Sequence, residues 1–437
     1  MRISLIVSIL FIFGVMSGYG HTLSGDPESK KYEPDSTPDR VVLSWVGDPS
    51  VSQAVTWRTD TTVTYAAAQI DIADANGYEL KGEIIRAHTV VFNSNIGKAH
   101  YHSVNFTGLA SGQLYAYRVG DGVNWSSWYH FRTAFKEPEP FSFVYFGDAQ
   151  DDIRSLWSRV VSEAFRTAPR AAFTLHGGDL VNRGNLDEQW GEWFEASGIT
   201  NTSIPVIATA GNHEYYRVKT GNLTNSYLTE HWRTQFSFPE NGPKDLEETC
   251  YYIDYQGARI VSLNSYHKYE EQAAWLREVL KNNTQRWTIV VFHYPMLSPR
   301  GRNYPVLFNL WKPVLDEFKV DLVLTGHDHT YARSNELLHT NAPQGAKNTE
   351  NSGTVYVVST SGPKLREMKR DSWMARAGNH IQLFQVIHVD PMQITFEARL
   401  ATGEVYDSFI IKKQEGQINM IVELLPEEKL VESSELN

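Results

Sequence analysis

The feature that most constrains the fold is a series of continuous apolar segments, each followed at once by a short polar motif. The segments are residues 141–146, 172–175, 205–210, 288–292 and 322–325. Segments of this kind are typical of strands buried on both faces. Helical patterns at residues 156–165 and 270–281 lie between some of them, so we expect a layered α/β fold. The motifs that follow the segments are Gly147-Asp148-Ala149-Gln150, Gly178-Asp179-Leu180-Val181-Asn182, Gly211-Asn212-His213-Glu214, Val290-Val291-Phe292-His293 and Gly326-His327-Asp328-His329.

Every motif places an Asp, Asn or His where a buried strand is expected to end. Because ligands bind beyond the carboxyl ends of strands in open α/β sheets, we expect all five motifs to meet on one rim. A site of oxygen and imidazole ligands suits Zn, Fe or Mn, and it differs in kind from a soft thiolate site. Two such ions sharing a carboxylate usually drive in-line displacement at phosphorus. The candidate ligands are Asp148, Asp179, Asn212, His293, His327 and His329.

The regions on either side of these motifs have strand patterns of their own. Short apolar and aromatic runs separated by Gly and Asp turns predict a β-sandwich of about 100 residues before the motifs, and a Pro-rich linker follows it. Later apolar runs predict strands that complete a second sheet. The acidic tail, residues 413–437, is expected to be poorly ordered, except that residues 422–425 could dock as a strand or helix. The runs before the motifs are residues 41–45, 54–59, 114–119 and 128–133, and the later runs are residues 354–358, 381–389, 394–400 and 405–411.

Length and composition narrow the class of protein. A chain of 437 residues predicts two or three domains with ample core. The formal net charge of −11 argues against nucleic acid as the main partner, because such binders usually carry a basic patch. The single cysteine, Cys250, excludes an intramolecular disulfide and a Cys-rich zinc site, and its apolar surroundings in the sequence indicate a buried thiol.

Residues 1–20 have the pattern of a signal peptide. Arg2 is followed by a mostly apolar stretch and then by small residues at 17–20. The stretch is short for a membrane-spanning helix, although an uncleaved anchor remains an alternative. No other segment has the pattern of a span, so we expect a secreted or periplasmic protein with no transmembrane segment in the mature chain.

The ordered motifs resemble those of the calcineurin-like metallophosphoesterase superfamily, and the preceding sandwich is similar to that of the purple acid phosphatases. The resemblance implies an α/β (α+β) four-layer metallophosphoesterase sandwich at residues 140–412, after an all-β fibronectin-III-like sandwich at 38–135. It also implies two metal ions, with Fe, Zn or Mn as candidates. Carried over by motif, the ligands of the first ion are Asp148, Asp179 and His329, and Asp179 bridges to a second ion held by Asn212, His293 and His327.

Two positions depart from the family pattern. Purple acid phosphatases carry a Tyr three residues after the second Asp, and its charge transfer to ferric iron gives the colour, but Asn182 stands here. Other branches use a His two residues after the first Asp, where this chain has Gln150. The resemblance therefore implies a colourless protein whose first ion is divalent and loosely held. Gln150 and Asn182 remain candidates for extra ligands or for contacts to the ligands.

The resemblance also suggests residues that act on the substrate. His213 would donate a proton to the leaving oxygen or a hydrogen bond to the phosphate, with an alternative role in supporting the ligands. Asp328 and His176 are candidates for orienting a ligand, although a core position fits His176 equally well. Arg300 and Arg302 lie on a Gly-containing loop after His293, where they either grip phosphate oxygens or face solvent.

These features together predict hydrolysis of small phosphate monoesters, of the acid-phosphatase type, by a metal-activated hydroxide. A phosphodiesterase or nucleotide phosphohydrolase would use the same metal core and stays an alternative. A catalytically degenerate surface-binding module is an alternative of another class, because Gln150 and Asn182 replace usual ligands. Metal content would separate the binding module from the two enzymes, because an inert module should bind no stoichiometric transition metal.

Overall fold

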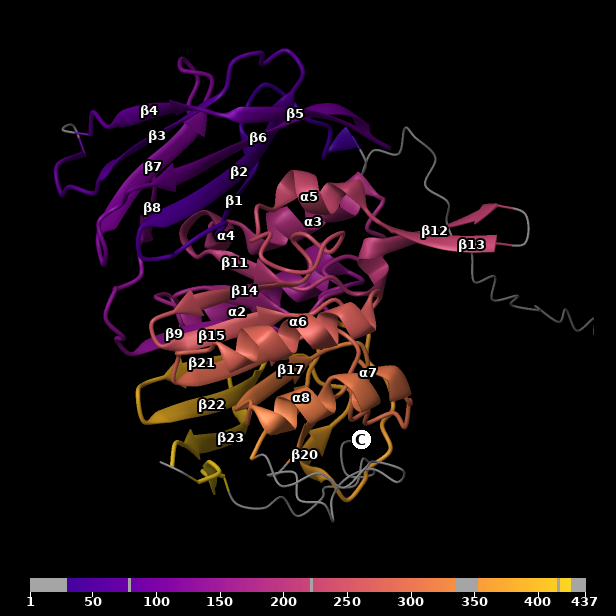
Figure 1. The fold of residues 1–437 in the computed structure, drawn as a ribbon. Coiled ribbons are helices and arrows are strands. Elements are labelled where there is room, and N and C mark those ends of the chain that lie inside the picture. The colour runs from indigo at the N-terminus through magenta and orange to yellow at the C-terminus, as the bar shows by residue number, and fades with distance from the viewer. Residues whose placement is uncertain (1–29, 78–79, 221–222, 335–352, 415–416, 426–437) are drawn as a thin grey trace, which may run out of the picture.

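The computed structural model describes residues 30–77, 80–220, 223–334, 353–414 and 417–425. An N-terminal all-β sandwich sits on a larger domain of sheets and helices (Figure 1). The expected signal peptide, residues 1–20, lies outside the described residues. No helix in the described ranges is both long enough and apolar enough to cross a membrane.

The N-terminal domain is the predicted β-sandwich. Its two sheets pair in the orders β1-β2-β6-β5 and β4-β3-β7-β8. Their inner faces enclose an aromatic core that includes Trp57, Tyr117 and Phe131, which gives two half-buried antiparallel sheets one shared interior. The strands are β1 (Asp39–Ser44), β2 (Ser52–Asp60), β3 (Ala67–Ile72), β4 (Glu83–Arg86), β5 (His88–Ser94), β6 (Gly97–Thr107), β7 (Leu114–Gly120) and β8 (Tyr129–Arg132).

The larger domain is built on two seven-stranded sheets. The first has the order β11-β10-β9-β21-β22-β23-β24, in which β9, β10 and β11 run parallel. Its strands are β9 (Phe141–Phe146), β10 (Thr174–His176), β11 (Val206–Ala208), β21 (Leu383–Val389), β22 (Gln393–Leu400), β23 (Val405–Lys412) and β24 (Met420–Glu423).

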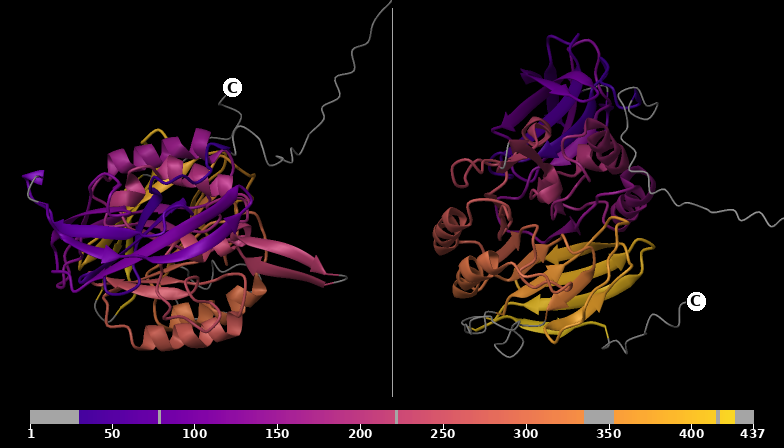
Figure 2. Two further views of the ribbon diagram at one scale, coloured as in Figure 1. Left: turned by 90° about the horizontal axis from the view of Figure 1, so that it is seen from above. Right: turned by 90° about the vertical axis from the view of Figure 1, so that its right-hand side faces the viewer.

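The second sheet has the order β14-β15-β16-β17-β19-β18-β20, and its central strands β15, β16, β17 and β19 are parallel. Its strands are β14 (Tyr251–Tyr255), β15 (Ala258–Ser262), β16 (Trp287–Val291), β17 (Leu322–Thr325), β18 (Tyr331–Ser334), β19 (Val355–Val358) and β20 (Met374–Gly378). A separate hairpin, β12 (Tyr215–Thr220) and β13 (Leu223–Leu228), projects from the body of the domain (Figures 1 and 2).

The two sheets pack face to face, with helices on both outer sides, which confirms the four-layer architecture. Alternation along β16 shows this, since Ile289 and Val291 join the core between the sheets, whereas Val290 joins the core beneath the second set of helices. The helices α2 (Ser158–Thr167), α3 (Asp187–Ser197) and α5 (Glu230–Gln235) add buried residues to the core that contains the first sheet. The helices α6 (Tyr269–Lys281), α7 (Pro305–Leu310) and α8 (Lys312–Glu317) add theirs to the core on the outer side of the second sheet. The short helix α4 (Thr200–Ser203) packs against β1 and β8 of the N-terminal domain.

One expectation about the sheets was wrong. The late strands do not all complete a second sheet, because β19 joins the second sheet while β21, β22 and β23 extend the first. The motif-bearing strands are also divided, since β9, β10 and β11 lie in the first sheet and β16 and β17 lie in the second. Strands that are apolar on both faces carry no periodicity that reveals their partner.

The predicted irregular tail contains a strand. β24 pairs antiparallel with β23, and Arg333 bridges Asp407 at 2.7 Å and Glu423 at 2.8 Å. Residues 420–423 therefore form the edge strand of the first sheet. This agrees with the alternative in which residues 422–425 dock as a strand. Cys250 is a free, buried thiol, as expected from its apolar neighbours.

A buried charge cluster joins the two domains. Asp187, at the start of α3, lies 2.8 Å from Arg40 of β1 and 2.9 Å from Arg58 of β2. His231 of α5 approaches the same carboxylate at 3.1 Å. Only 1% of the Asp187 side chain is exposed. Although burial alone would raise its pKa, Arg40, His231 and Arg58 hold the pKa of Asp187 below the ordinary range.

Candidate metal centre

The five motifs converge where the carboxyl ends of the parallel strands in both sheets meet. Asp148 follows β9, His293 follows β16, and both lie fully buried. The backbone is tightly turned here, since Asp179, His327 and His329 all have positive φ, at 52°, 71° and 55°. Left-handed conformations cost energy in residues other than glycine and gather at functional sites.

Glycines in the motifs leave room for the carboxylates. A Cβ on Gly211 would lie 2.2 Å from Oδ1 of Asp179, and one on Gly326 would lie 2.6 Å from Oδ2 of Asp148. No side chain fits at either contact. The motif glycines therefore allow the backbone to approach the two Asp side chains.

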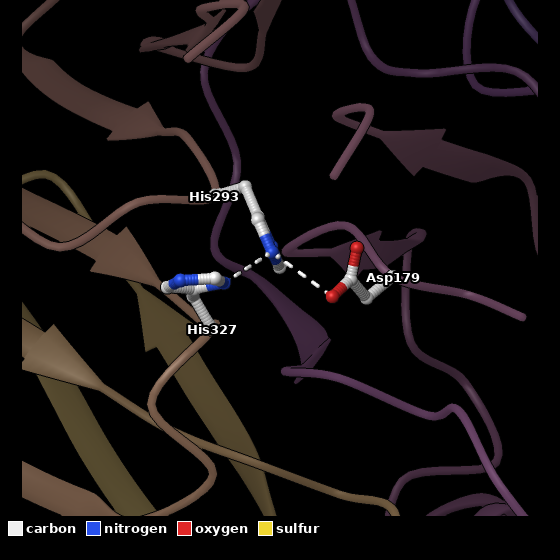
Figure 3. Close-up of side chains that lie close together, drawn as sticks. All are labelled: Asp179, His293 and His327. Atoms are coloured by element: carbon white, nitrogen blue, oxygen red, sulfur yellow. Dashed lines mark hydrogen bonds and ion pairs between the residues drawn. The ribbon is translucent and has the colours of Figure 1, made fainter. Parts of the chain in front are cut away.

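One cluster of candidate ligands centres on His293. Its Nε2 lies 3.1 Å from Oδ2 of Asp179 and 3.1 Å from Nδ1 of His327 (Figure 3). The same Nε2 lies 3.2 Å from Oδ1 of Asn212. Nδ1 of His293 donates to the carbonyl of Gly177 at 2.9 Å, so in the neutral ring Nε2 carries a lone pair. Asp179, His293 and His327 each offer a ligand atom within 4.8 Å of the other two, which suits a cation.

A second cluster shares Asp179. One ligand atom each from Asp148, Asp179 and His329 lies within 4.8 Å of the others, and all three residues are buried. His329 donates from Nδ1 to the carbonyl of Lys364 at 2.5 Å, which turns its Nε2 toward Oδ1 of Asp148 at 3.9 Å. That Oδ1 has no hydrogen-bond partner among the residues that the structure describes. A buried carboxylate oxygen without a donor fits a bound cation.

The pKa shifts in the two clusters have the same physical origin. Burial, with the charge of Asp179, raises the pKa of Asp148 to about 7, against the effect of His293. Burial alone would lower the pKa of His293, but the carboxylates of Asp179 and Asp148 raise it to about 9. Burial also opposes ionisation of Asp179, whose pKa is nevertheless lowered by His293 and His213. Closely packed carboxylates and imidazoles therefore need positive charge among them.

Glu214 supports the site, although the sequence motif gave it no role. Its buried carboxylate accepts backbone N–H bonds from Asp179 at 2.9 Å, Leu180 at 2.8 Å and Gly211 at 2.7 Å. It thereby ties the loop after β10 to the loop after β11. A Glu at the fourth place of Gly-Asn-His-Glu is the only sequence signal that could have revealed it.

His213 lies beside the clusters and is partly open to solvent. Its Nδ1 donates to the carbonyl of Asn182 at 2.5 Å. Its Nε2 lies 3.8 Å from Oδ2 of Asp179, and 27% of the side chain is exposed. The backbone N–H of His213 donates to Oδ1 of Asp179 at 2.8 Å. The ring is thus fixed with Nε2 at the open edge of the site.

The two departures from the family pattern behave differently. Gln150 is buried and contacts both Asp179 and His329. Asn182 instead holds His213 through its backbone carbonyl, and it is one of the residues that line a neighbouring cavity of about 510 Å³.

Of the remaining candidates, Arg302 reaches the site. It contacts Nε2 of His327, and its Nε lies 3.4 Å from Oδ1 of Asp328. Asp328 also accepts a hydrogen bond from Ser298, so it anchors the Arg302 loop. The described contacts of Arg300 include a backbone N–H bond to Ser298 at 3.2 Å.

The structure places His176 in the core. It packs against Phe146, Trp157 and Trp193, and its Nε2 lies 3.2 Å from Oγ1 of Thr174. Burial lowers its pKa to about 3, so it is neutral. Successive side chains of a strand point to opposite faces, and that of His176 points into the aromatic core. The described contacts of His176 therefore do not support a role in orienting a metal ligand.

Comparison with known proteins gives the same two-part organisation. The model of the calcineurin-like phosphoesterase family matches residues 141–331. The model of the purple acid phosphatase N-terminal domain matches residues 38–133. The first match includes all six candidate ligands, because it runs from β9 to the start of β18.

Individual relatives are more distant. An uncharacterised protein of Mycobacterium tuberculosis is 27% identical over 340 residues, covering 68% of this chain and 62% of that protein. A phosphoenolpyruvate phosphatase of Allium cepa is 29% identical over 343 residues, covering 72% of this chain and 62% of that enzyme. The match thus spans less than two thirds of the length of either relative.

A solved structure shares the fold. A purple acid phosphatase from yellow lupin (Lupinus luteus) seeds superposes with a TM-score of 0.72 at 19% identity, covering 87% of this chain and 75% of that one. This superposition and the two family matches agree with the sheets and motifs described above. The chain therefore contains a calcineurin-like phosphoesterase domain, preceded by a domain that matches the N-terminal domain of the purple acid phosphatases.

Proposed function

We propose that this protein is a metal-dependent phosphatase that hydrolyses small phosphate monoesters. The observation that carries the proposal is the pair of ligand clusters that share Asp179 at a partly open rim. The residues fit two cations, with Asp148 and His329 on one side of Asp179 and Asn212, His293 and His327 on the other. Fe, Zn and Mn suit this set of oxygen and imidazole ligands.

The surrounding residues have separate parts in the proposed reaction. Two bound ions would neutralise phosphate charge and lower the pKa of a water that attacks phosphorus in line. His213 would stand at the leaving-group side and protonate the leaving oxygen from Nε2. Because its Nδ1 already donates to Asn182, Nε2 can donate only when the ring is an imidazolium. Arg302, held by Asp328, would hydrogen-bond a phosphate oxygen.

The same observations weigh against a degenerate binding module. All six candidate ligands are present and gathered, and His213 is positioned at the opening. The onion relative is named a phosphoenolpyruvate phosphatase, which supports a monoester as the substrate class. The acidic net charge of −11 agrees with a small substrate rather than a nucleic-acid scaffold.

Hydrolysis of p-nitrophenyl phosphate and of bis-p-nitrophenyl phosphate tests the proposal. Metal-reconstituted protein is expected to prefer the monoester, and Asn212→Ala should abolish that turnover. Preferential diester hydrolysis would replace this proposal with a phosphodiesterase. Absence of turnover together with absence of bound metal would leave a binding module.

A His213→Ala variant is expected to lose turnover but keep its metal. Removing a general acid costs roughly 10²–10⁴-fold in rate, and the loss should be larger for alkyl phosphates, whose leaving oxygen needs the proton, than for p-nitrophenyl phosphate. Steady-state kinetics on both substrates, with metal analysis of the same samples, would check this. Equal losses on both substrates would contradict the assigned role.

Iron-loaded protein is expected to be colourless in the visible range. Asn182 stands where a Tyr would give charge transfer to ferric iron, and an amide side chain gives no such band. An absorption spectrum of the iron-loaded protein checks this, with Asn182→Tyr as the matched variant. A strong visible band in the unaltered protein would contradict the expectation.

We also propose that the protein is exported. The support is the sequence of residues 1–20, with Arg2, an apolar stretch and small residues at its end. N-terminal sequencing of the mature protein would show whether cleavage occurs near residue 20. A mature chain that begins at Met1 would contradict cleavage.

A further inference from the structure

The loop between β16 and α7 carries two arginines and is fastened beside a candidate metal ligand. The backbone N–H groups of Arg300 and Arg302 donate to Oγ of Ser298 at 3.2 and 3.0 Å. That hydroxyl donates to Oδ2 of Asp328, and Nε of Arg302 lies 3.4 Å from Oδ1 of the same carboxylate. The guanidinium of Arg302 also contacts His327. The loop therefore has a fixed place at the rim of the site.

The loop between β19 and β20 carries a third arginine and is fastened to the same motif. The backbone N–H of Arg366 donates to the carbonyl of His329 at 3.1 Å. The carbonyl of Lys364 accepts from Nδ1 of His329 at 2.5 Å. The backbone N–H of Lys369 donates to the carbonyl of Pro299 at 2.7 Å, which joins this loop to the first one. The arginines of the two loops therefore keep fixed places relative to each other and to the candidate ligands.

Two of the cations on these loops have a carboxylate as partner. Arg302 has Asp328, as described above. Nζ of Lys364 lies 3.5 Å from Oδ2 of Asp151 and donates to Oε1 of Gln150 at 3.1 Å. The charges of Arg302 and Lys364 are therefore compensated within the site.

Arg300 and Arg366 differ from these two cations. Neither guanidinium has an ion pair or a side-chain hydrogen bond within the part of the chain that the structure describes. The first loop contains no acidic residue. The acidic residues of the second loop are engaged elsewhere, since Glu367 lies 2.7 Å from His380 and Asp371 accepts a backbone N–H bond from the next residue. Two positive charges at the rim are therefore left for an anion from outside.

The two guanidinium groups lie close enough to influence each other. Partial burial, followed by the charge of Arg302, lowers the pKa of Arg300; the charge of Arg366 adds to this effect, and Asp328 opposes it. A guanidinium nevertheless stays charged in proteins, and its planar fork binds carboxylate or phosphate through two N–H groups. An anion between the two groups would relieve their repulsion.

The arginine loops and His213 flank the same cluster of candidate ligands. Nε2 of His213 lies 3.8 Å from Oδ2 of Asp179, and Arg302 contacts His327. Asp179 and His327 offer ligand atoms within 4.8 Å of each other. A leaving group that takes its proton from His213 is therefore near enough to extend toward the arginine loops.

We propose that Arg300 and Arg366 form a subsite for a second anionic group on the substrate. The preferred substrates are then phosphate monoesters whose leaving group also carries a carboxylate or another phosphate. Arg302 is left for the phosphate at the metal centre. This inference rests on the proposed phosphatase function and names the substrate class of the same site.

Steady-state hydrolysis of matched esters by metal-reconstituted, full-length protein tests the inference. Glycerol 3-phosphate has a hydroxymethyl group where 3-phosphoglycerate has a carboxylate and glycerol 1,3-bisphosphate has a second phosphate. The esters with a second anionic group should have KM values about tenfold lower, the effect of one hydrogen bond between charged groups. The difference should appear in KM rather than kcat, because the second group is bound alike before and during the reaction. A preference for only one of the two would support the subsite and identify its anion.

Arg366→Met and Arg300→Met should each remove most of this difference in KM. Because neither guanidinium has a described partner, both variants should fold. Arg370→Met removes an exposed arginine of the same loop and should keep the difference, which separates a local contact from the loss of one positive charge. Equal KM values for the three esters in the unaltered protein would overturn the inference, as would both variants behaving like Arg370→Met. Absence of turnover of glycerol 3-phosphate and of p-nitrophenyl phosphate would overturn the proposed phosphatase function as well.

Binding of phosphonates provides a measurement that needs no turnover. The probes are 3-phosphonopropanoate and propylphosphonate, which has a methyl group in place of the carboxylate. Calorimetric titration of the metal-reconstituted protein should show tighter binding of 3-phosphonopropanoate, and Arg366→Met should remove that advantage. Equal affinities of the two phosphonates for the unaltered protein would contradict a carboxylate subsite at these arginines.

Discussion

Asp179→Asn is expected to remove both metal ions of the proposed centre and with them the proposed phosphatase activity. Asp179 is the one residue that belongs to both ligand clusters. Asn keeps the shape of the side chain and tolerates the left-handed backbone at φ 52°, so the fold should survive. Loss of a group that only contacts ligands costs about 10–100-fold, and loss of the shared ligand should cost more, on the order of 10³-fold or beyond.

Metal analysis and steady-state kinetics on the same preparations would check this result. Asp152→Asn is a matched control, because Asp152 is an exposed Asp that also has positive φ, at 44°. The control should bind two ions and retain activity. If Asp179→Asn still bound two ions per chain and kept its activity, the central role of this residue would be wrong.

Asp187→Ala is expected to lower the free energy of unfolding by about 3–5 kcal/mol, the range found when one partner of a buried ion pair is removed. The substitution leaves Arg40 and Arg58 buried without their shared carboxylate. Because both Arg residues belong to the N-terminal domain and Asp187 to the larger domain, the loss falls on the domain interface. Denaturant titration followed by Trp fluorescence would measure it.

Glu188→Ala on the same helix is the control. Glu188 accepts a hydrogen bond from Asn95 in an exposed setting, and exposed interactions of this kind are worth less than about 1 kcal/mol. A loss for Asp187→Ala no larger than that of the control would contradict the assigned role of the cluster.

The Asp187 contribution should also depend on pH. The pKa of Asp187 is lowered in the folded state, so its stabilisation is fully present above the unfolded pKa of about 3.9 and is lost as the pH falls below that value. The stability difference between the unaltered protein and Asp187→Asn should be constant above about pH 5 and shrink in more acidic solution. A difference that grew on acidification would contradict this.

Much of the fold could be read from the sequence because its strands end in informative residues. The apolar run at residues 141–146 predicted β9 (Phe141–Phe146) with the same bounds, and Asp148 follows it as expected. The division of strands between two sheets could not be read, because β16 is buried along its whole length. Pairing depends on contacts between sheets, which a local pattern does not contain.

The candidate ligands could also be predicted from the sequence, but the residues that contact them could not. Each candidate ligand lies beside its strand in sequence, whereas the groups that modulate the ligands come from elsewhere. Lys364 is 214 positions from Gln150, so only the folded chain shows that the amide oxygen is already taken. His176, two positions before the motif glycine Gly178, looked like a helper and proved to belong to the aromatic core.

Anomalous X-ray scattering from Zn²⁺-loaded crystals tests the central claim most directly. The account predicts two peaks on either side of the Asp179 carboxylate, one bounded by Asn212, His293 and His327 and the other by Asp148 and His329. Absence of a peak next to Asp179 in protein that is active with Zn²⁺ would contradict the account.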